Sequence, residues 1–240
     1  MPAAVQPTVE VWWDQPGPGY LAHLPLLDAV EQTRYHAYRR EVDQLNFLAA
    51  RVIIKKVLAG RSGVPPERIR LISDCPQCGQ PHGKPRTDTG EYELSIAHCA
   101  GLVVVAVGTT YPLGVDVEPR PGADRFAAIA DLAPHILAPT ERAHVDGLDE
   151  PVRAEYVIRY WTWKEAALKA TGDGLGIDPN RVVFSPPGRR PELIEWPGDP
   201  AGRAALVLDE LALHSDYIAA LAVLGTLAAA PIVRRVDSGL

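Results

Sequence analysis

Residues 151–171 constrain the fold most, because they predict one long helix with a defined end. Glycines at 172, 174 and 176 follow the stretch, and glycine commonly terminates a helix. A second helix is predicted over 27–60, where apolar residues recur at helical spacing before Gly60. A third is predicted over 125–148, with a restart at Pro139. These helices must bury their apolar sides against other elements.

Strands are predicted between the helices, where short apolar runs are bounded by turn residues. They are Val9–Trp13, Leu94–Ile96, Leu102–Val107, Leu113–Val117, Val182–Phe184, Ala205–Leu211 and Tyr217–Val223. The fold class is therefore α+β, with helices packed on mainly antiparallel strands. A midpoint near Pro112 divides the chain into halves at 1–112 and 113–228, with a tail at 229–240. No internal sequence repeat is evident.

Composition narrows the class of protein. A net charge of −6 argues against a general nucleic-acid binder. The apolar runs are too short or too interrupted for a membrane-spanning helix, and no signal-peptide pattern opens the chain, so we expect a cytoplasmic protein. Three cysteines, an odd and low count, argue against a secreted disulfide scaffold.

Charge is distributed unevenly along the chain. Between Arg34 and Arg86 there are eleven Lys or Arg residues and only four Asp or Glu residues, so the remainder of the chain is strongly acidic. Such a basic segment fits a local anionic ligand such as a phosphate-bearing cofactor. Before any motif is considered, a solvated helix face is the better explanation of the charge.

The segment Gly114-Val115-Asp116-Val117-Glu118 places two carboxylates on one face of a strand, because side chains alternate along a strand. Neighbouring carboxylates repel each other unless a cation lies between them. Mg²⁺ commonly uses one or two carboxylates together with substrate phosphates and water. Taken alone, the pair is better explained as a solvated strand end.

The segment Trp161-Thr162-Trp163-Lys164-Glu165-Ala166-Ala167-Leu168-Lys169 places Glu165 and Lys169 on one side of a helix, at i and i+4. In isolation, this pair is best explained as a surface salt bridge. Next to a magnesium–pyrophosphate complex, the same two groups would supply a ligand or base and a compensating positive charge.

Together, the two segments strongly resemble the signature of the Sfp-type 4′-phosphopantetheinyl transferases, which is Gly-x-Asp-x-Glu followed later by Trp-x-x-Lys-Glu-x-x-x-Lys. The resemblance extends to Phe47–Lys55, Gly83-Lys84-Pro85, Ser95–His98 and 136–148, and so covers roughly 30–185. It implies an enzyme that transfers the phosphopantetheine arm of coenzyme A to a serine of apo acyl or peptidyl carrier proteins, releasing adenosine 3′,5′-bisphosphate.

The resemblance also implies residue roles. Asp116, Glu118 and Glu165 would hold Mg²⁺, with Mn²⁺ as the alternative metal, and Lys169 would offset charge on the α-phosphate and leaving group. Either Glu165 or a water held by Glu118 would act as general base. Lys164 would orient this cluster or contact a phosphate. The remaining contacts to coenzyme A, the co-substrate, would come from Arg51, Lys84 and His98, near the 3′-phosphate.

For the fold, the resemblance implies two pseudo-symmetric halves, each with an antiparallel sheet packed against helices, and an active site in the cleft between them. The chain would then act as a monomer, with no nucleic-acid or membrane partner. One departure is Ala97, where the family commonly has Ser or Thr before the histidine.

The loop containing Cys75, Cys78 and His82 offers three zinc ligands at most, and a structural zinc site needs four. We expect a reduced, metal-free loop there.

Two other functions stay open at this point. One is a different magnesium-dependent nucleotide enzyme, against which stands the absence of a P-loop or Rossmann glycine fingerprint. The other is a non-catalytic module that binds carrier proteins, against which stands the complete acidic trio.

Overall fold

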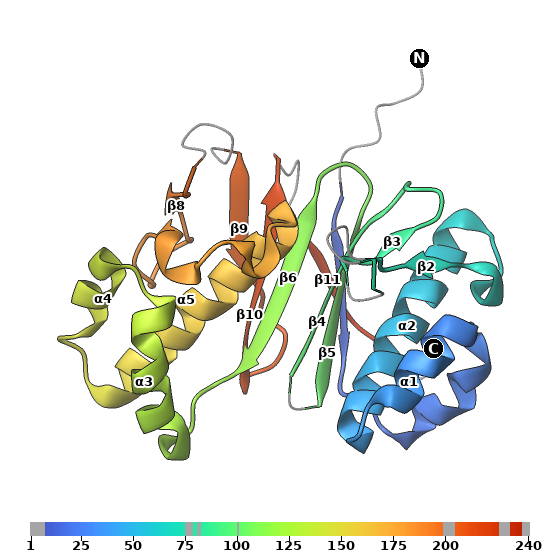
Figure 1. The fold of residues 1–240 in the computed structure, drawn as a ribbon, viewed down its shortest axis with the longest axis horizontal. Helices are drawn as coiled ribbons and strands as arrows, with labels where there is room; N and C mark the ends of the chain where they lie inside the picture. The colour runs from blue at the N-terminus through green and yellow to red at the C-terminus, as the bar shows by residue number, and fades with distance from the viewer. Residues whose placement is uncertain are drawn as a thin grey trace. The chain divides into compact units, whose positions relative to one another are not determined.

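The computed structural model describes residues 8–74, 79–80, 83–99, 101–198, 205–225 and 231–236 (Figure 1). Its contacts divide these residues into two compact units. The N-terminal unit comprises 8–110 and 231–236, and the C-terminal unit comprises 111–225. The predicted metal-free loop at Cys75, Cys78 and His82 lies outside the described residues. No helix in the described ranges has the length and apolar character needed to cross a membrane.

The N-terminal unit contains a six-stranded sheet in the order β11-β1-β5-β4-β3-β2. Its strands are β1 (Glu10–Asp14), β2 (Leu71–Ile72), β3 (Arg86–Thr87), β4 (Glu93–Cys99), β5 (Leu102–Gly108) and β11 (Ile232–Arg235). All neighbours pair antiparallel except β11, which runs parallel to β1. β11 falls in the segment that the sequence suggested as a tail, because its apolar residues are too few to predict a strand.

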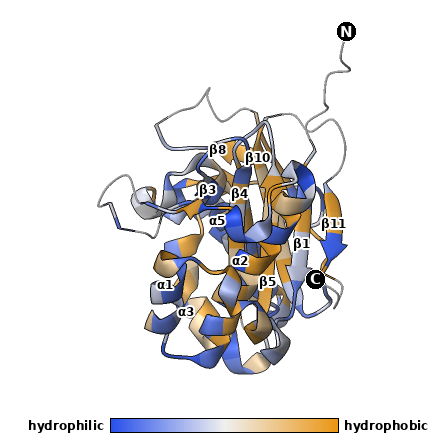
Figure 2. Ribbon diagram, turned by 90° about the vertical axis from the view of Figure 1, so that its right-hand side faces the viewer, coloured by the Kyte–Doolittle hydropathy of each residue, from blue (hydrophilic) through white to orange (hydrophobic). Residues whose placement is uncertain are grey.

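Helix α2 (Glu41–Ser62) packs against β5 and supplies much of the apolar core of this unit. In Figure 2, β5 is coloured as hydrophobic, which matches its complete burial. Shorter helices precede and follow α2; they are η1 (Pro18–Leu26), α1 (Ala29–Ala37) and η2 (Pro66–Arg68).

The single helix predicted over 27–60 is wrong in two respects. The chain is extended at Tyr38 and Arg40, which separates α1 from α2, and α2 continues through Gly60. The helix ends instead at Gly63, whose φ of 71° is a left-handed conformation that glycine adopts without steric cost.

The C-terminal unit contains a three-stranded antiparallel sheet in the order β6-β10-β9 and a two-stranded ribbon, β7 with β8. The strands are β6 (Leu113–Pro119), β7 (Val183–Phe184), β8 (Leu193–Glu195), β9 (Leu206–Glu210) and β10 (Tyr217–Leu224).

Helix α5 (Glu150–Thr171) lies across β6 and β10, with α3 (Phe126–Ile136) and α4 (Pro139–Val145) beside it (Figure 1). Short 3₁₀ segments occur at η3 (Ala123–Arg125), η4 (Gly174–Gly176) and η5 (Pro179–Arg181). The predicted helix over 151–171 is confirmed almost to the residue. The predicted α+β fold, with antiparallel sheets packed against helices, is confirmed as well.

Candidate active site

The glycine of the strand motif, Gly114, lets α5 lie directly on β6. A Cβ atom added at Gly114 would lie 2.1 Å from the carbonyl oxygen of Ala166 and 2.4 Å from the amide nitrogen of Ala170. Both atoms belong to the α5 backbone, so they cannot move away as a side-chain tip could. Gly114 is therefore required by the close approach of helix and strand, and this approach brings the α5 side chains onto the carboxylates of β6.

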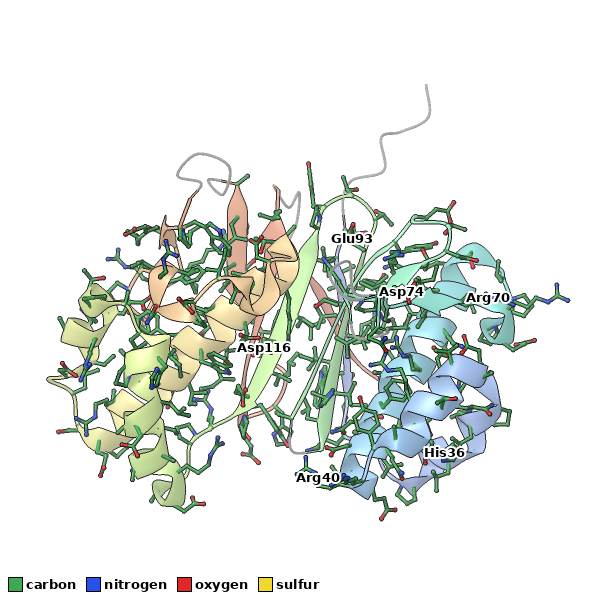
Figure 3. The ribbon with its side chains drawn as sticks, viewed as in Figure 1. His36, Arg40, Arg70, Asp74, Glu93 and Asp116 are labelled. Atoms are coloured by element: carbon green, nitrogen blue, oxygen red, sulfur yellow. The ribbon has the colours of Figure 1, made fainter. Side chains whose placement is uncertain are left out.

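Asp116 lies on β6 beside α5 and is 6% exposed (Figure 3). Its Oδ1 accepts a hydrogen bond of 2.6 Å from Nζ of Lys169, which also donates to the backbone oxygen of Val115 at 3.2 Å. Burial raises the pKa of Asp116, and the charge of Lys169 offsets part of that effect. The other carboxylate oxygen, Oδ2, is buried without a hydrogen-bond partner.

Glu118 lies two residues further along the same face of β6 and is half-buried. Its Oε1 accepts a hydrogen bond of 3.0 Å from the indole Nε1 of Trp161 on α5. Burial, followed by the negative charge of Asp116, raises the pKa of Glu118, while the indole hydrogen bond opposes the shift. The strand alternation read from the sequence therefore places both carboxylates toward the helix.

Glu165 completes the acidic group from the helix side. Burial raises its pKa, and the negative charges of Asp116 and then Glu118 raise it further, while Lys169 opposes the shift. Its Oε1 is buried without a hydrogen-bond partner, like Oδ2 of Asp116. The carboxylates of Asp116, Glu118 and Glu165 thus lie close enough for their charges to interact, and Lys169 is hydrogen-bonded to Asp116.

The residues fit a divalent cation by the chemistry of their donors. Unpartnered buried carboxylate oxygens are costly, and a hard cation would satisfy both of them. Within the described residues, no three His, Cys, Asp or Glu side chains are arranged so that they could hold a metal ion by themselves. A cation that takes one or two carboxylates and completes its shell with phosphate and water suits this arrangement, and Mg²⁺ is such a cation.

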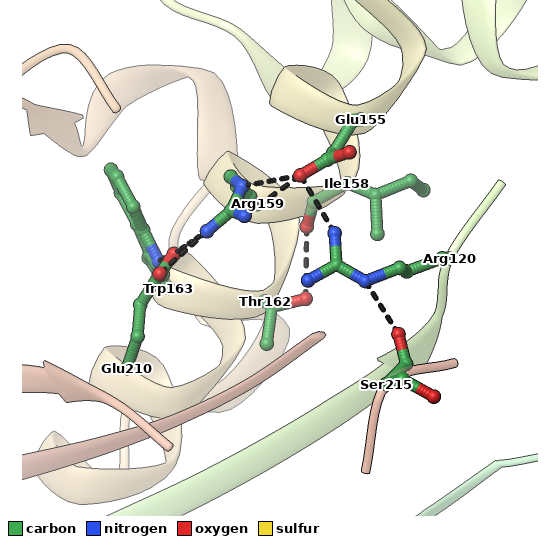
Figure 4. Close-up of polar contacts among 8 residues, drawn as sticks. All are labelled: Arg120, Glu155, Ile158, Arg159, Thr162, Trp163, Glu210 and Ser215. Atoms are coloured by element: carbon green, nitrogen blue, oxygen red, sulfur yellow. Dashed lines mark hydrogen bonds and ion pairs between the residues drawn. The ribbon is translucent and has the colours of Figure 1, made fainter. Parts of the chain in front are cut away.

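A second polar network holds the middle of α5 in place (Figure 4). Arg159 donates to Glu155 one turn earlier and to Glu210 at the end of β9. Trp163 also donates to Glu210, through Nε1 at 3.0 Å. Arg120, just beyond β6, donates to Glu155 at 2.7 Å. These bonds tie α5 to the strand that carries the carboxylates and to the far strand of the sheet.

Lys164 points away from the acidic group, although it precedes Glu165 in the sequence. Its side chain is completely buried, and Nζ donates to Oε2 of Glu141 at 2.5 Å and to the backbone oxygen of Ile136 at 2.7 Å. Glu141 also accepts from the amides of Ala138 and Phe184. The structure therefore does not bring Lys164 together with Asp116, Glu118, Glu165 and Lys169.

Arg51 lies on α2 in the N-terminal unit and is 4% exposed. Its guanidinium lies over the ring of Phe47 and donates to Oγ of Ser73 at 3.4 Å, with Glu31 at 3.6 Å. Nε and Nη1 have no hydrogen-bond partner. Burial lowers the pKa of Arg51, and the positive charge of Arg34 lowers it further against the opposing effect of Glu31.

The other two basic candidates lie on or near β4. Lys84 pairs with Glu93 at 3.3 Å; burial lowers its pKa, and Glu93 offsets part of this shift. His98 is exposed and close enough to Asp43 to lower the pKa of that carboxyl, an effect secondary to the hydrogen bond from Arg40. Ala97 is buried, so a hydroxyl at this position would lie on the covered side of the strand.

Sequence patterns alone do not identify Trp161 and Glu141 as partners of site residues. Helical spacing did not single out Trp161, whose indole Nε1 donates to Oε1 of Glu118. The place of Glu141 in the first helical turn after Pro139 is the one feature that the sequence offers for it. Its ion pair with Lys164 joins residues too far apart in the sequence to be predicted from local spacing.

Comparisons with known proteins give consistent results. Residues 112–222 match the family model described as the 4′-phosphopantetheinyl transferase superfamily. The chain is 29% identical over 172 residues to the putative 4′-phosphopantetheinyl transferase slr0495 of Synechocystis, with 69% of this chain and 64% of that protein covered. It is 28% identical over 203 residues to the 4′-phosphopantetheinyl transferase HetI of Nostoc, with 83% and 79% covered.

Among solved structures, the Holo-ACP-synthase of Plasmodium yoelii covers 47% of this chain and 91% of its own, at 19% identity and a TM-score of 0.38.

Proposed function

Because residues 112–222 match the model of the 4′-phosphopantetheinyl transferase superfamily, we propose that this chain is a member and transfers the phosphopantetheine arm of coenzyme A to a serine of an apo carrier protein. The observation that carries the proposal is the group of three carboxylates on β6 and α5, buried at Asp116 and half-buried at Glu118 and Glu165, with Lys169 bonded to Asp116. Acyl and peptidyl carrier proteins are the proposed partners.

In the proposed reaction, the serine hydroxyl attacks the β-phosphorus of coenzyme A. A new P–O bond forms, the bond to the oxygen that bridges the two phosphates breaks, and adenosine 3′,5′-bisphosphate leaves with that oxygen. The serine proton passes to Glu165, whose raised pKa suits a general base, or to a water held by Glu118. Lys169 stabilises the negative charge that accumulates on the leaving group.

Asp116, Glu118 and Glu165 would hold Mg²⁺, or Mn²⁺ as the alternative. The buried oxygens without a hydrogen-bond partner are Oδ2 of Asp116 and Oε1 of Glu165. The metal would neutralise charge on the pyrophosphate. Without a cation, burial and mutual repulsion disfavour the charged forms of these carboxylates. Lys169 and, at Glu118, Arg125 oppose this effect, and a bound cation would favour the charged forms further.

The N-terminal unit is proposed to bind the adenosine 3′-phosphate through Arg51, Lys84 and His98. Arg51 is included because its Nε and Nη1 have no hydrogen-bond partner, although Nε lies 3.6 Å from Oε1 of Glu31, and a guanidinium is well suited to bind phosphate. Since one chain supplies both the basic and the acidic residues, we propose that the enzyme acts as a monomer in the cytoplasm.

Intact mass spectrometry tests the proposal. The full chain is incubated with coenzyme A, MgCl₂ and a panel of apo acyl and peptidyl carrier proteins, and a carrier that gains one phosphopantetheine group identifies a substrate. Asp116→Asn serves as the matched control, since it removes one carboxylate and little volume. Carrier binding without any mass gain would favour a non-catalytic binding module, and transfer to a small molecule would favour a different nucleotide enzyme.

A further inference from the structure

Each unit contains a 22-residue helix with one completely buried lysine. In the C-terminal unit, Lys164 on α5 is 0% exposed, and its Nζ donates to Glu141 and to the backbone oxygen of Ile136. In the N-terminal unit, Lys55 on α2 is 1% exposed, and its Nζ donates to Oε2 of Glu31 at 2.6 Å and to the backbone oxygen of Leu26 at 2.7 Å. We call this arrangement the lysine anchor.

The two anchors agree in detail. In both, the glutamate precedes the lysine by nearly the same distance, 24 residues in one unit and 23 in the other. The accepting carbonyl lies 29 residues before Lys55 and 28 before Lys164. Each glutamate is the third residue of a short helix and also accepts the amide of the residue that caps that helix. The same structural module therefore occurs twice in the chain, although no sequence repeat was evident.

The lysine anchor of the N-terminal unit occurs without counterparts of Glu165 and Lys169. Lys56 and Gly60 follow Lys55 at the positions that Glu165 and Lys169 occupy after Lys164. An anchor that persists where neither side chain is present must hold its helix for a reason other than phosphate chemistry. The ammonium of Lys164 is also fully buried and already donates to Glu141 and to the backbone oxygen of Ile136.

We propose that Lys164 is a positioning residue, which fixes the rotation of α5 through Glu141 so that Glu165 and Lys169 face the carboxylates of β6. Successive helix residues point about 100° apart, so Lys164 can bind α4 while Glu165 faces the sheet. Glu165 and Lys169 share one rigid helix, and any rotation moves both. The expected effect on kcat rests on the proposed transferase function. The proposed orientation of α5 does not.

The kinetic test compares Lys164→Met with Lys55→Met, which removes the equivalent anchor in the other unit. Both variants are expected to melt at lower temperature, since each removes the lysine that pairs with a buried glutamate. Glu141 then has lost its ion-pair partner Lys164, and Glu31 keeps Arg51 at 3.6 Å. Well below the melting temperature, Lys164→Met should lower kcat by about tenfold or more, because a displacement of ~1 Å can cost up to ~10² in rate. Its KM for coenzyme A should stay within about threefold of wild type, whereas Lys55→Met should keep kcat within about twofold.

A phosphate contact predicts the opposite pattern. If Lys164→Met raises KM and weakens coenzyme A binding while kcat is unchanged, Lys164 touches the substrate and the proposal fails. It also fails if kcat and KM both match wild type in the folded variant. Should Lys164→Met not fold, Glu141→Gln provides the second variant, because it removes the charge with little change in volume. Its one oxygen can replace only one of the two that accept from the amides of Ala138 and Phe184.

A spectroscopic readout separates this proposal from the transferase function. The indole Nε1–H of Trp161 donates to Glu118 and reports the rotation of α5 without any turnover. Its ¹H–¹⁵N resonance, assigned with Trp161→Phe, should shift in Lys164→Met or Glu141→Gln and stay in place in Lys55→Met. An unshifted resonance in both C-terminal variants overturns the proposal, whereas a wild-type chain that modifies no carrier overturns only the transferase function.

Discussion

Replacing Gly114 with alanine tests whether the close packing of α5 on β6 is what assembles the site. The new methyl group would lie 2.1 Å from the carbonyl oxygen of Ala166 and 2.8 Å from Cβ of Lys169. Since ordinary van der Waals contact begins near 3.4 Å, the helix and strand must separate by roughly 1 Å. That movement would carry Lys169 and Glu165 away from Asp116.

The expected cost can be estimated for both stability and rate. Overpacking of this kind typically destabilises by about 1–3 kcal/mol. For a chain of this size, ~2 kcal/mol corresponds to a fall in Tm of about 4–8 °C. A displacement of ~1 Å in the catalytic groups can lower kcat by up to ~10². Differential scanning fluorimetry measures the first effect, and steady-state transfer to an apo carrier measures the second.

Gly60→Ala is the matched control for this substitution. Gly60 is exposed within α2, and a Cβ atom built there has no neighbour within 4 Å. Alanine at an exposed helix interior should stabilise by about 0.5–1 kcal/mol, with kcat unchanged. The reasoning is refuted if Gly114→Ala keeps the Tm and kcat of wild type, or if the two alanine variants behave alike.

Three further predictions concern the carboxylates and the cofactor. Asp116→Asn should keep the circular dichroism spectrum of wild type and lower kcat by about 10²–10³, and near wild-type turnover would contradict its assigned role. Because the three carboxylates have raised pKa values in the folded state, the metal-free chain loses stability as pH rises from their ordinary range toward neutral. The rise in Tm caused by MgCl₂ should therefore be larger at pH 7.5 than at pH 5, and a rise independent of pH would count against a carboxylate site. Dephospho-coenzyme A should bind more weakly than coenzyme A in calorimetry, and Lys84→Ala or His98→Ala should narrow the difference. Equal affinities of the wild type for the two compounds would show that the 3′-phosphate is not recognised.

Local patterns in the sequence were sufficient to predict most of the acidic site. Strand alternation placed Asp116 and Glu118 on one face, and helical spacing placed Glu165 with Lys169. These periodicities depend only on backbone geometry, which is the same wherever the segment lies. The predicted helix over 151–171 and the strands at β4, β5 and β6 follow for the same reason.

Tertiary structure decided which partner each charged side chain binds. Lys164 and Lys169 lie in one motif, yet one pairs with Glu141 on α4 and the other with Asp116 on β6. Both lysines are compatible with either role in the sequence, because ion pairing depends on distances between residues far apart in the chain. The pairing of β11 with β1 is likewise long-range, joining segments from opposite ends of the chain. The sequence by itself determined the periodic elements and the chemical groups that they present, and only packing determined which of those groups meet.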